Sequence, residues 1–332
     1  EFKITVIRNI LIKFLSVVLI LLLVKEKSDI YLYGVIMTSS MLLSVLVLWP
    51  YLKGRISFYK PTWNDIKKHI KPNLILFIPV IAVSIYKVMD KVMLGNLASF
   101  QEVGLYDYAE KIIAIPIACV NALGTVMLPR MSNLAGKNMN DKETIIIEKS
   151  LLVGLFLSSS MAFGLMAIAD VFVPFFYGAG YEKCVTLFYI LLPSCLFLAV
   201  ANVIRTQYLI PHCKDKIFVV SIVLGALVNF IINIALIPHL QSIGAAIGTL
   251  IAEMTVCIYQ LACVRHTLTL KKIYSDIVYI ILMTFVMLII VYFIPYCIND
   301  IITLGIKVLV GCAVCFFGLI IRYKKTERSI GI

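Results

Sequence analysis

The chain contains apolar runs that are too long for the interior of a water-soluble domain. Residues 151–169, 184–204 and 277–299 each lack Asp, Glu, Lys and Arg. A helix needs about 20 apolar residues to cross the hydrocarbon core of a bilayer, whereas the strands of a membrane barrel alternate in polarity. These runs do not alternate, and backbone groups in lipid must be satisfied within their own segment. The predicted fold class is therefore an all-α polytopic membrane protein.

The composition excludes several other classes of protein. Of the 332 residues, 61% are hydrophobic and 14% are charged, whereas a soluble domain is about half apolar and about a quarter charged. A soluble enzyme, a disordered chain and a secreted disulfide scaffold are ruled out. Most of the nine cysteines lie in apolar stretches, where Cys acts as a small hydrophobe, and the four histidines are scattered. We therefore predict neither a metal site nor a cofactor.

About ten segments are long enough to be transmembrane helices. They are residues 5–24, 30–51, 74–95, 105–128, 150–170, 184–204, 217–237, 244–264, 276–295 and 301–321. Three of them contain an internal proline, Pro79, Pro116 or Pro193. Proline removes a backbone donor, so each is predicted to kink its helix. Kinked helices suit a bundle that rocks between two states.

The basic residues indicate how the chain is oriented. Of the 30 Lys and Arg residues, 22 fall on one side of the predicted spans and 3 on the other. Basic loops stay in the cytoplasm, so both ends of the chain are predicted to be cytoplasmic. The net charge of +12 then needs no nucleic-acid partner. The basic segment 52–73 places Trp63, Ile66 and Ile70 at helical spacing, which predicts an interfacial helix on anionic membrane lipids.

Six ionisable side chains lie inside two neighbouring predicted spans. They are Lys87, Asp90 and Lys91 in the third span and Asp107, Glu110 and Lys111 in the fourth. Charge in the membrane costs at least about 2.5–3.5 kcal/mol near its centre, so it needs a reason. The two groups are expected at similar depth in the outer half of the bilayer. Two interpretations stay open: ion pairs that hold the helix hairpin together, or the lining of a polar cavity that contacts substrate or a coupling ion.

Glu253 is a separate case, because it lies near the middle of the eighth predicted span. A lone carboxylate there suits a proton carrier. The alternative is a carboxylate that is hydrogen-bonded to a neighbouring helix, with Asn229 or Asn233 as its partner. Arg205, at the cytoplasmic end of the sixth span, could meet lipid headgroups or a diphosphate.

The motifs of common enzyme classes are absent. The sequence has no G-x-x-x-x-G-K-[ST] phosphate loop, no H-E-x-x-H and no G-x-S-x-G. The predicted outer loops are short, so no extracellular domain could hold an active site. We predict that the protein is not an enzyme.

The order of several short stretches resembles a known family. They are K-P-N-L-I-L-F-I-P-V, K-V-M-D-K-V-M-L-G, V-G-L-Y-D-Y-A-E-K-I and V-M-L-P-R-M-S-N-L between residues 71 and 136, then F-Y-G-A-G-Y at 176–181, Q-Y-L-I-P at 207–211 and I-G-A-A-I-G-T-L-I-A-E at 243–253. Together they look like the Wzx-type polysaccharide repeat-unit flippases of the multidrug/oligosaccharidyl-lipid/polysaccharide exporter superfamily. The resemblance covers about residues 71–253.

The resemblance implies a fold and a task. Members have 12–14 helices in two bundles, and they move undecaprenyl-diphosphate-linked oligosaccharides across the bacterial plasma membrane by alternating access, for capsule or O-antigen. Implied partners are this substrate, membrane lipids and H⁺ or Na⁺ as coupling ion, in a monomer. The matching Asp90, Asp107 and Glu253 and the nearby lysines are the implied cavity residues. Ten spans and the absence of an initial Met predict a fragment that lacks about four N-terminal helices.

The resemblance also implies an organisation into parts. Residues 1–51 are predicted to end a first bundle, 52–73 to link, 74–265 to form the core of a second bundle around a central cavity, and 266–332 to add two spans and a basic cytoplasmic tail. Two other functions remain open. One is an ion-coupled drug or metabolite antiporter of the same superfamily, against which the lysine-rich polar group argues. The other is a polytopic polysaccharide polymerase, for which a long outer loop is expected and is not found.

Overall fold

The computed structural model describes most of the chain. It describes the backbone of residues 2–47, 49–52, 59–137, 139–265 and 273–330, and the side chains of these ranges except 2–6, 27, 51–52, 71–72, 74–87, 140 and 323–330. These ranges contain helices and no strand, so the predicted all-α fold class is confirmed. The α-helices are α1 (Phe2–Leu23), α2 (Ile30–Leu46), α3 (Trp63–Leu97), α4 (Phe100–Gly136), α5 (Asn140–Tyr177), α6 (Lys183–Leu191), α7 (Ser194–Ile204), α8 (Asp215–Leu240), α9 (Ser242–Val264), α10 (Tyr274–Tyr292) and α11 (Asp300–Ile330).

Each of the ten predicted spans coincides with a helix or, for the sixth span, with the pair α6 and α7. Among the described residues, seven helical segments are long and apolar enough to cross a membrane, and α2 is a shorter apolar helix. The helix predicted around Trp63 is the first part of α3, which runs on without interruption to Leu97. Its interfacial position stays a prediction.

The chain divides into two compact units, Glu1–Asn73 and Leu74–Ile332. In the first unit, α1 and α2 pack against each other. The turn between them is held by Asp29, whose carboxylate accepts hydrogen bonds from the backbone N–H groups of Lys25 and Glu26, both at 3.0 Å. These two bonds hold the pKa of Asp29 below its usual range. The assignment of the two units to two exporter bundles stays a prediction.

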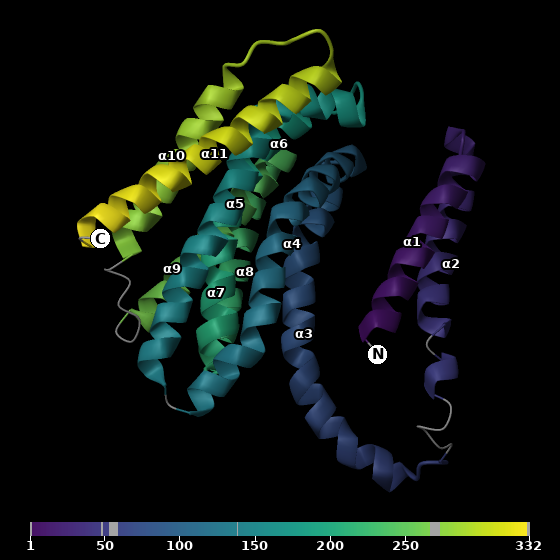
Figure 1. Cartoon of the computed structure of the whole chain (residues 1–332). Coiled ribbons are helices and arrows are strands. Elements are labelled where there is room, and N and C mark those ends of the chain that lie inside the picture. Colours follow the sequence, from purple (N-terminus) through teal and green to yellow (C-terminus); the bar gives the residue numbers. More distant parts are fainter. Residues whose placement is uncertain (1, 48, 53–58, 138, 266–272, 331–332) are drawn as a thin grey trace. The chain divides into compact units, whose positions relative to one another are not determined.

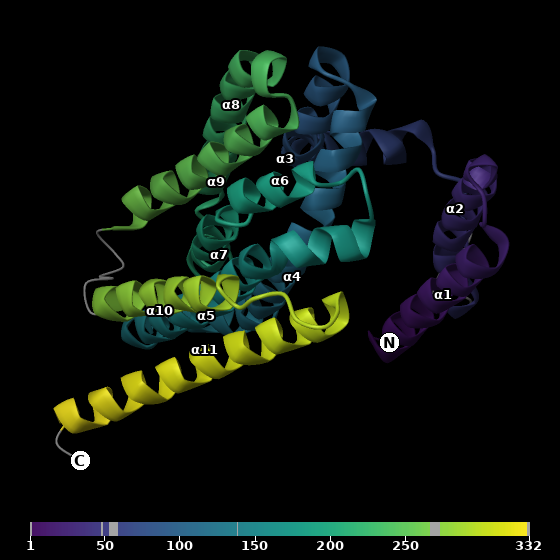
Figure 2. The same cartoon turned by 90° about the horizontal axis from the view of Figure 1, so that it is seen from above.

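In the second unit, α8 and α9 form a close antiparallel pair, and α5 packs against α4, α7 and α10 (Figures 1 and 2). Small residues permit the approach of α8 to α9. A Cβ atom on Gly248 would collide with the Oδ1 of Asn233, and one on Gly244 would lie 2.7 Å from the backbone of Leu236. Helices in lipid associate through such packing, because no hydrophobic force drives them together there.

The prolines act differently from one helix to the next. Pro193 separates α6 from α7, so the sixth predicted span is broken there as expected. Pro116 remains inside α4, where it is buried. Pro79 lies in α3, and its side chain is outside the described residues. After α7 the chain continues in a π-helix, Arg205–Leu209, which the sequence did not predict.

Candidate functional site

Asp90 lies at a junction of four helices in the second unit. Its carboxylate, on α3, accepts hydrogen bonds from the hydroxyl of Tyr106 on α4 at 3.0 Å and from the hydroxyl of Thr249 on α9 at 2.8 Å. The side-chain amide of Asn233 on α8 donates a third hydrogen bond at 2.6 Å. Asp90 is 8% exposed, so a buried carboxylate connects four separate segments of the sequence.

Among the described side chains, the hydrogen-bond partners of Asp90 are neutral. Two of these partners also contact oxygen atoms of neighbouring residues. Asn229 Oδ1 accepts from Asn233 at 3.1 Å, and the backbone oxygen of Ala245 lies 3.1 Å from the Thr249 hydroxyl, whose single proton it shares with Asp90. Asn233 Oδ1 is buried and has no hydrogen-bond partner in the described part of the chain. A buried acid among carbonyl, amide and hydroxyl oxygens is the environment that a hard cation prefers, and a proton could also neutralise it.

A second group of charges bridges α3 and α4. Lys91 Nζ lies 2.6 Å from Asp107 Oδ1 and 2.8 Å from Glu110 Oε2, and Lys111 Nζ lies 2.8 Å from Asp107 Oδ2. We refer to Lys91, Asp107, Glu110 and Lys111 as the ion cluster. Of the two interpretations of these charges, the ion-pair hairpin is present in the structure. The same side chains are 30–64% exposed, so the cluster is also accessible from outside the helix pair.

Lys87 and Glu253 are the remaining predicted site residues. Lys87 is in α3, and its side chain is outside the described residues. Glu253 is half-buried on α9, one turn after Thr249. The amide of Asn233, which the sequence offered as a partner for Glu253, donates to Asp90 instead.

A polar contact that the sequence did not predict lies near the start of α4. Lys183 Nζ donates to both carboxylate oxygens of Glu102, at 2.8 and 2.7 Å, and to Gln241 Oε1 at 2.9 Å. The backbone N–H and the hydroxyl of Ser242 also donate to Glu102. We call this the Glu102 clamp. It joins α4, α6 and the turn before α9, and sequence spacing could not reveal it because its members are 81 and 140 positions apart.

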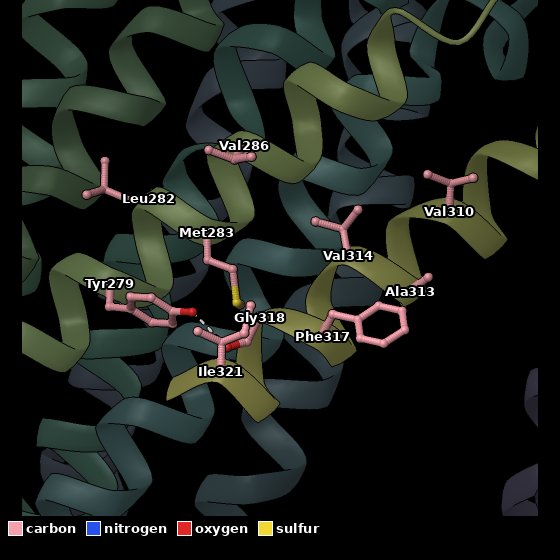
Figure 3. A pocket seen from close by; sticks show the side chains of 10 residues that line it. All are labelled: Tyr279, Leu282, Met283, Val286, Val310, Ala313, Val314, Phe317, Gly318 and Ile321. Atoms are coloured by element: carbon pink, nitrogen blue, oxygen red, sulfur yellow. Dashed lines mark hydrogen bonds between the residues drawn. The ribbon is translucent and has the colours of Figure 1, made fainter. Parts of the chain in front are cut away.

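An apolar groove between α10 and α11 has a volume of about 620 Å³ (Figure 3). Its lining includes Met283, Val286, Val314 and Phe317. At one end the hydroxyl of Tyr279 donates to the backbone oxygen of Gly318 at 2.7 Å, which joins the two helices. Such a groove in two membrane-spanning helices suits a hydrocarbon chain.

Arg205 occupies the first position of the π-helix. Its guanidinium lies 5.4 Å from the centre of the Phe218 ring, and its Nε is buried without a hydrogen-bond partner in the described part of the chain. The contact of Arg205 with headgroups or a diphosphate stays a prediction. The π-helix that carries Arg205 could not be read from the sequence pattern.

Comparison with known proteins places these features in context. The family model described as "Polysaccharide biosynthesis protein" matches residues 1–135. A putative O-antigen transporter of Escherichia coli strain K12 is 25% identical over 260 residues, which are 78% of this chain and 62% of that protein. A probable low-salt glycan biosynthesis flippase of Haloferax volcanii, Agl15, is 22% identical over 236 residues, which are 70% of this chain and 49% of that protein.

A solved structure gives the fold. The lipid II flippase MurJ in an inward closed conformation superposes with a TM-score of 0.75 at 21% identity, over 97% of this chain and 66% of that one. The predicted resemblance is borne out by the polysaccharide family model and by the named transporter and flippase relatives. The chain spans less than two thirds of the length of these matched proteins. They are named as transporters and flippases rather than enzymes, in agreement with the absence of enzyme motifs.

Proposed function

We propose that this chain is part of a flippase that carries undecaprenyl-diphosphate-linked oligosaccharides across the bacterial plasma membrane by alternating access, for O-antigen or capsule synthesis. The observation that carries the proposal is the ion cluster, whose charged side chains are accessible on α3 and on α4, a helix long and apolar enough to cross a membrane. The named relatives support the glycan-lipid class of substrate.

The physical argument starts from the cost of charge in lipid. Side chains such as Lys111, 64% exposed, would be costly against acyl chains. They are acceptable if they face a water-filled space between helices. A diphosphate bearing sugars is large, polar and anionic, and it cannot cross hydrocarbon unaided. The ammonium groups of Lys91 and Lys111 would replace part of its hydration, while the lipid tail stays in the bilayer.

The Asp90 junction would supply the coupling. A Na⁺ ion or a proton bound at Asp90 would neutralise a buried charge whose partners, among the side chains that the structure describes, are neutral. Because these partners come from α4, α8 and α9, occupancy of the junction would alter the packing of α3 against three helices at once. Glu253, one turn from Thr249, is proposed as a second acidic group of the ion pathway, and Lys87 as a further basic group of the cavity.

The groove between α10 and α11 would hold the polyprenyl tail of the substrate. Its lining is apolar, and both helices are long and apolar enough to cross a membrane. We also propose that the protein crosses the inner membrane several times and that both ends of this chain lie in the cytoplasm. It acts as a monomer.

The decisive experiment uses substitutions in the chromosomal gene. Lys87→Ala, Lys91→Ala and Lys111→Ala are expected to lower the surface polysaccharide and to cause lipid-linked repeat units to accumulate on the cytoplasmic side. Lys67→Ala, an exposed lysine at the start of α3, is the matched control and should have no effect. Full export in all three lysine variants would remove the cavity interpretation. Ion-coupled efflux of small organic cations, with unchanged polysaccharide, would favour the antiporter alternative.

A further inference from the structure

Three tyrosine rings from two distant parts of the second unit form one cluster. The ring centres of Tyr108 and Tyr177 are 5.3 Å apart, those of Tyr108 and Tyr181 are 5.2 Å apart, and those of Tyr177 and Tyr181 are 5.4 Å apart. We call these residues the tyrosine cluster. Tyr108 belongs to α4, Tyr177 ends α5, and Tyr181 follows in the loop that leads to α6.

The F-Y-G-A-G-Y segment builds the cluster. Gly178 and Gly180 have φ angles of 82° and 94°, which residues with a Cβ atom rarely adopt. The turn they form brings Tyr177 and Tyr181 together. The hydroxyl of Tyr177 then donates to the backbone oxygen of Tyr108 at 2.9 Å, which fixes the loop against α4.

Charged groups adjoin the rings on α4. Lys111 Nζ lies 5.0 Å from the centre of the Tyr108 ring, and it also pairs with Asp107 at 2.8 Å. Asp107, Tyr108 and Lys111 lie at helical spacing on one side of α4. Tyr108 itself is 36% exposed. The rings are therefore part of an accessible surface that carries both signs of charge.

We propose that the tyrosine cluster, together with Asp107 and Lys111, is a carbohydrate subsite that holds the sugar next to the diphosphate of the lipid-linked substrate. This inference rests on the proposed flippase function and specifies where the glycan is recognised. It also gives the F-Y-G-A-G-Y segment a binding role beyond its turn.

The chemistry of a glycosyl diphosphate fits this arrangement. A pyranose ring has an apolar face of C–H groups, which packs on an aromatic face, and an edge of hydroxyl groups, which donate to carboxylates. Asp107 supplies the carboxylate and Lys111 the cation for the adjoining phosphate. Tyrosines at a membrane interface usually contact lipid headgroups. Here the ion pair beside the rings favours a polar ligand that has an apolar face.

The test compares two probes on the whole chain in nanodiscs. The probes are undecaprenyl diphosphate and the same lipid carrying an N-acetylglucosamine-containing disaccharide. The wild-type chain is expected to bind the disaccharide form more tightly by about 10-fold. Tyr181→Ala should reduce this ratio by about 5-fold through loss of one ring contact, without changing the Kd for the sugar-free lipid. Tyr181→Phe, which keeps the ring, should retain the ratio.

Two further variants separate the possible outcomes. Tyr296→Ala removes an exposed tyrosine from the loop before α11 and should leave both Kd values unchanged. Tyr108→Leu should reduce the ratio of the two Kd values as Tyr181→Ala does. If Tyr108→Leu fails to fold, the result for Tyr181→Ala, in the loop before α6, decides the test. A wild-type ratio retained in Tyr181→Ala would overturn the subsite while leaving the flippase proposal intact. Failure of the folded wild-type chain to bind either lipid would contradict the flippase proposal itself.

Discussion

The side-chain amide of Asn233 donates a hydrogen bond of 2.6 Å to the carboxylate of Asp90, although the two residues are 143 positions apart in the sequence. This bond joins α8 to α3, and Asn233 in turn packs against Gly248 of α9. The junction therefore depends both on the charge of Asp90 and on the absence of a side chain at position 248.

Removing the charge of Asp90 tests the proposed coupling site. In wild-type protein, Na⁺ at 100-fold excess over its Kd should stabilise the fold by about 2.7 kcal/mol, because it binds only the native state. Asp90→Asn keeps the size of the side chain and should abolish this effect. The measurement is thermal unfolding in detergent, in NaCl and in choline chloride, repeated at several pH values to detect a proton instead. Equal Na⁺ stabilisation of both proteins would refute the site.

Adding a methyl group at Gly248 tests the packing that supports the junction. A Cβ there would collide with the Oδ1 of Asn233, so Gly248→Ala must displace the side chain that donates to Asp90. The expected loss is about 1–3 kcal/mol in the free energy of unfolding, with transport impaired. Gly164→Ala on α5 is the control, because its added Cβ meets no atom within 4 Å. If the two variants unfold at the same temperature, the close approach at Gly248 does not contribute to the stability of the fold.

Much of the fold could be predicted from the sequence, because a helix needs about 20 apolar residues to cross the hydrocarbon core of a membrane. All ten predicted spans fall on helices, and the break at Pro193 lies inside the predicted sixth span. The π-helix at Arg205 was missed, since no residue pattern in Arg205–Leu209 distinguishes it from the α-helix before it.

The candidate site was predictable only where its members are close in sequence. The pair Asp107 and Lys111 follows from i, i+4 spacing on one helix. The bond from Asn233 to Asp90 does not, because it depends on which of several helices pack together. Sequence spacing does not show which helices pack together. For this reason Asn233 was predicted as a possible partner of Glu253, and the Glu102 clamp was not predicted.

Neutralising Glu102 tests the clamp between α4, α6 and the turn before α9. Glu102→Gln would retain a hydrogen-bond acceptor for Ser242 but lose the charge that pairs with Lys183. Loss of one partner of a largely buried ion pair should lower the free energy of unfolding by about 2 kcal/mol. The measurement is again thermal unfolding in detergent.

Glu182→Gln, at an exposed neighbouring carboxylate, is the control for the clamp and should change the unfolding temperature little. The double variant Glu102→Gln with Lys183→Met should recover part of the loss, because no unpaired ammonium then remains. A double variant as unstable as the sum of both single ones would argue against direct coupling.

Filling the groove between α10 and α11 tests its role for the lipid tail. Val314→Trp adds volume inside the lining of the 620 Å³ groove. If a polyprenyl chain lies there, binding of a long-chain lipid-linked oligosaccharide should weaken by about 10-fold or more, while a short-chain analogue should bind as before. The measurement is the Kd of both analogues in nanodiscs. Equal weakening for the two would show that the groove does not hold the tail.

The most direct test of the account asks what the ion cluster faces in a living membrane. A photoreactive amino acid is placed at Ala114, an exposed position one turn after Glu110 on α4, so that the cluster itself is kept. The same probe at Leu309 of α11, which is 71% exposed, is the comparison. The account predicts adducts that carry diphosphate-linked glycan at position 114 and phospholipid adducts at position 309. Phospholipid adducts alone at both positions would contradict it.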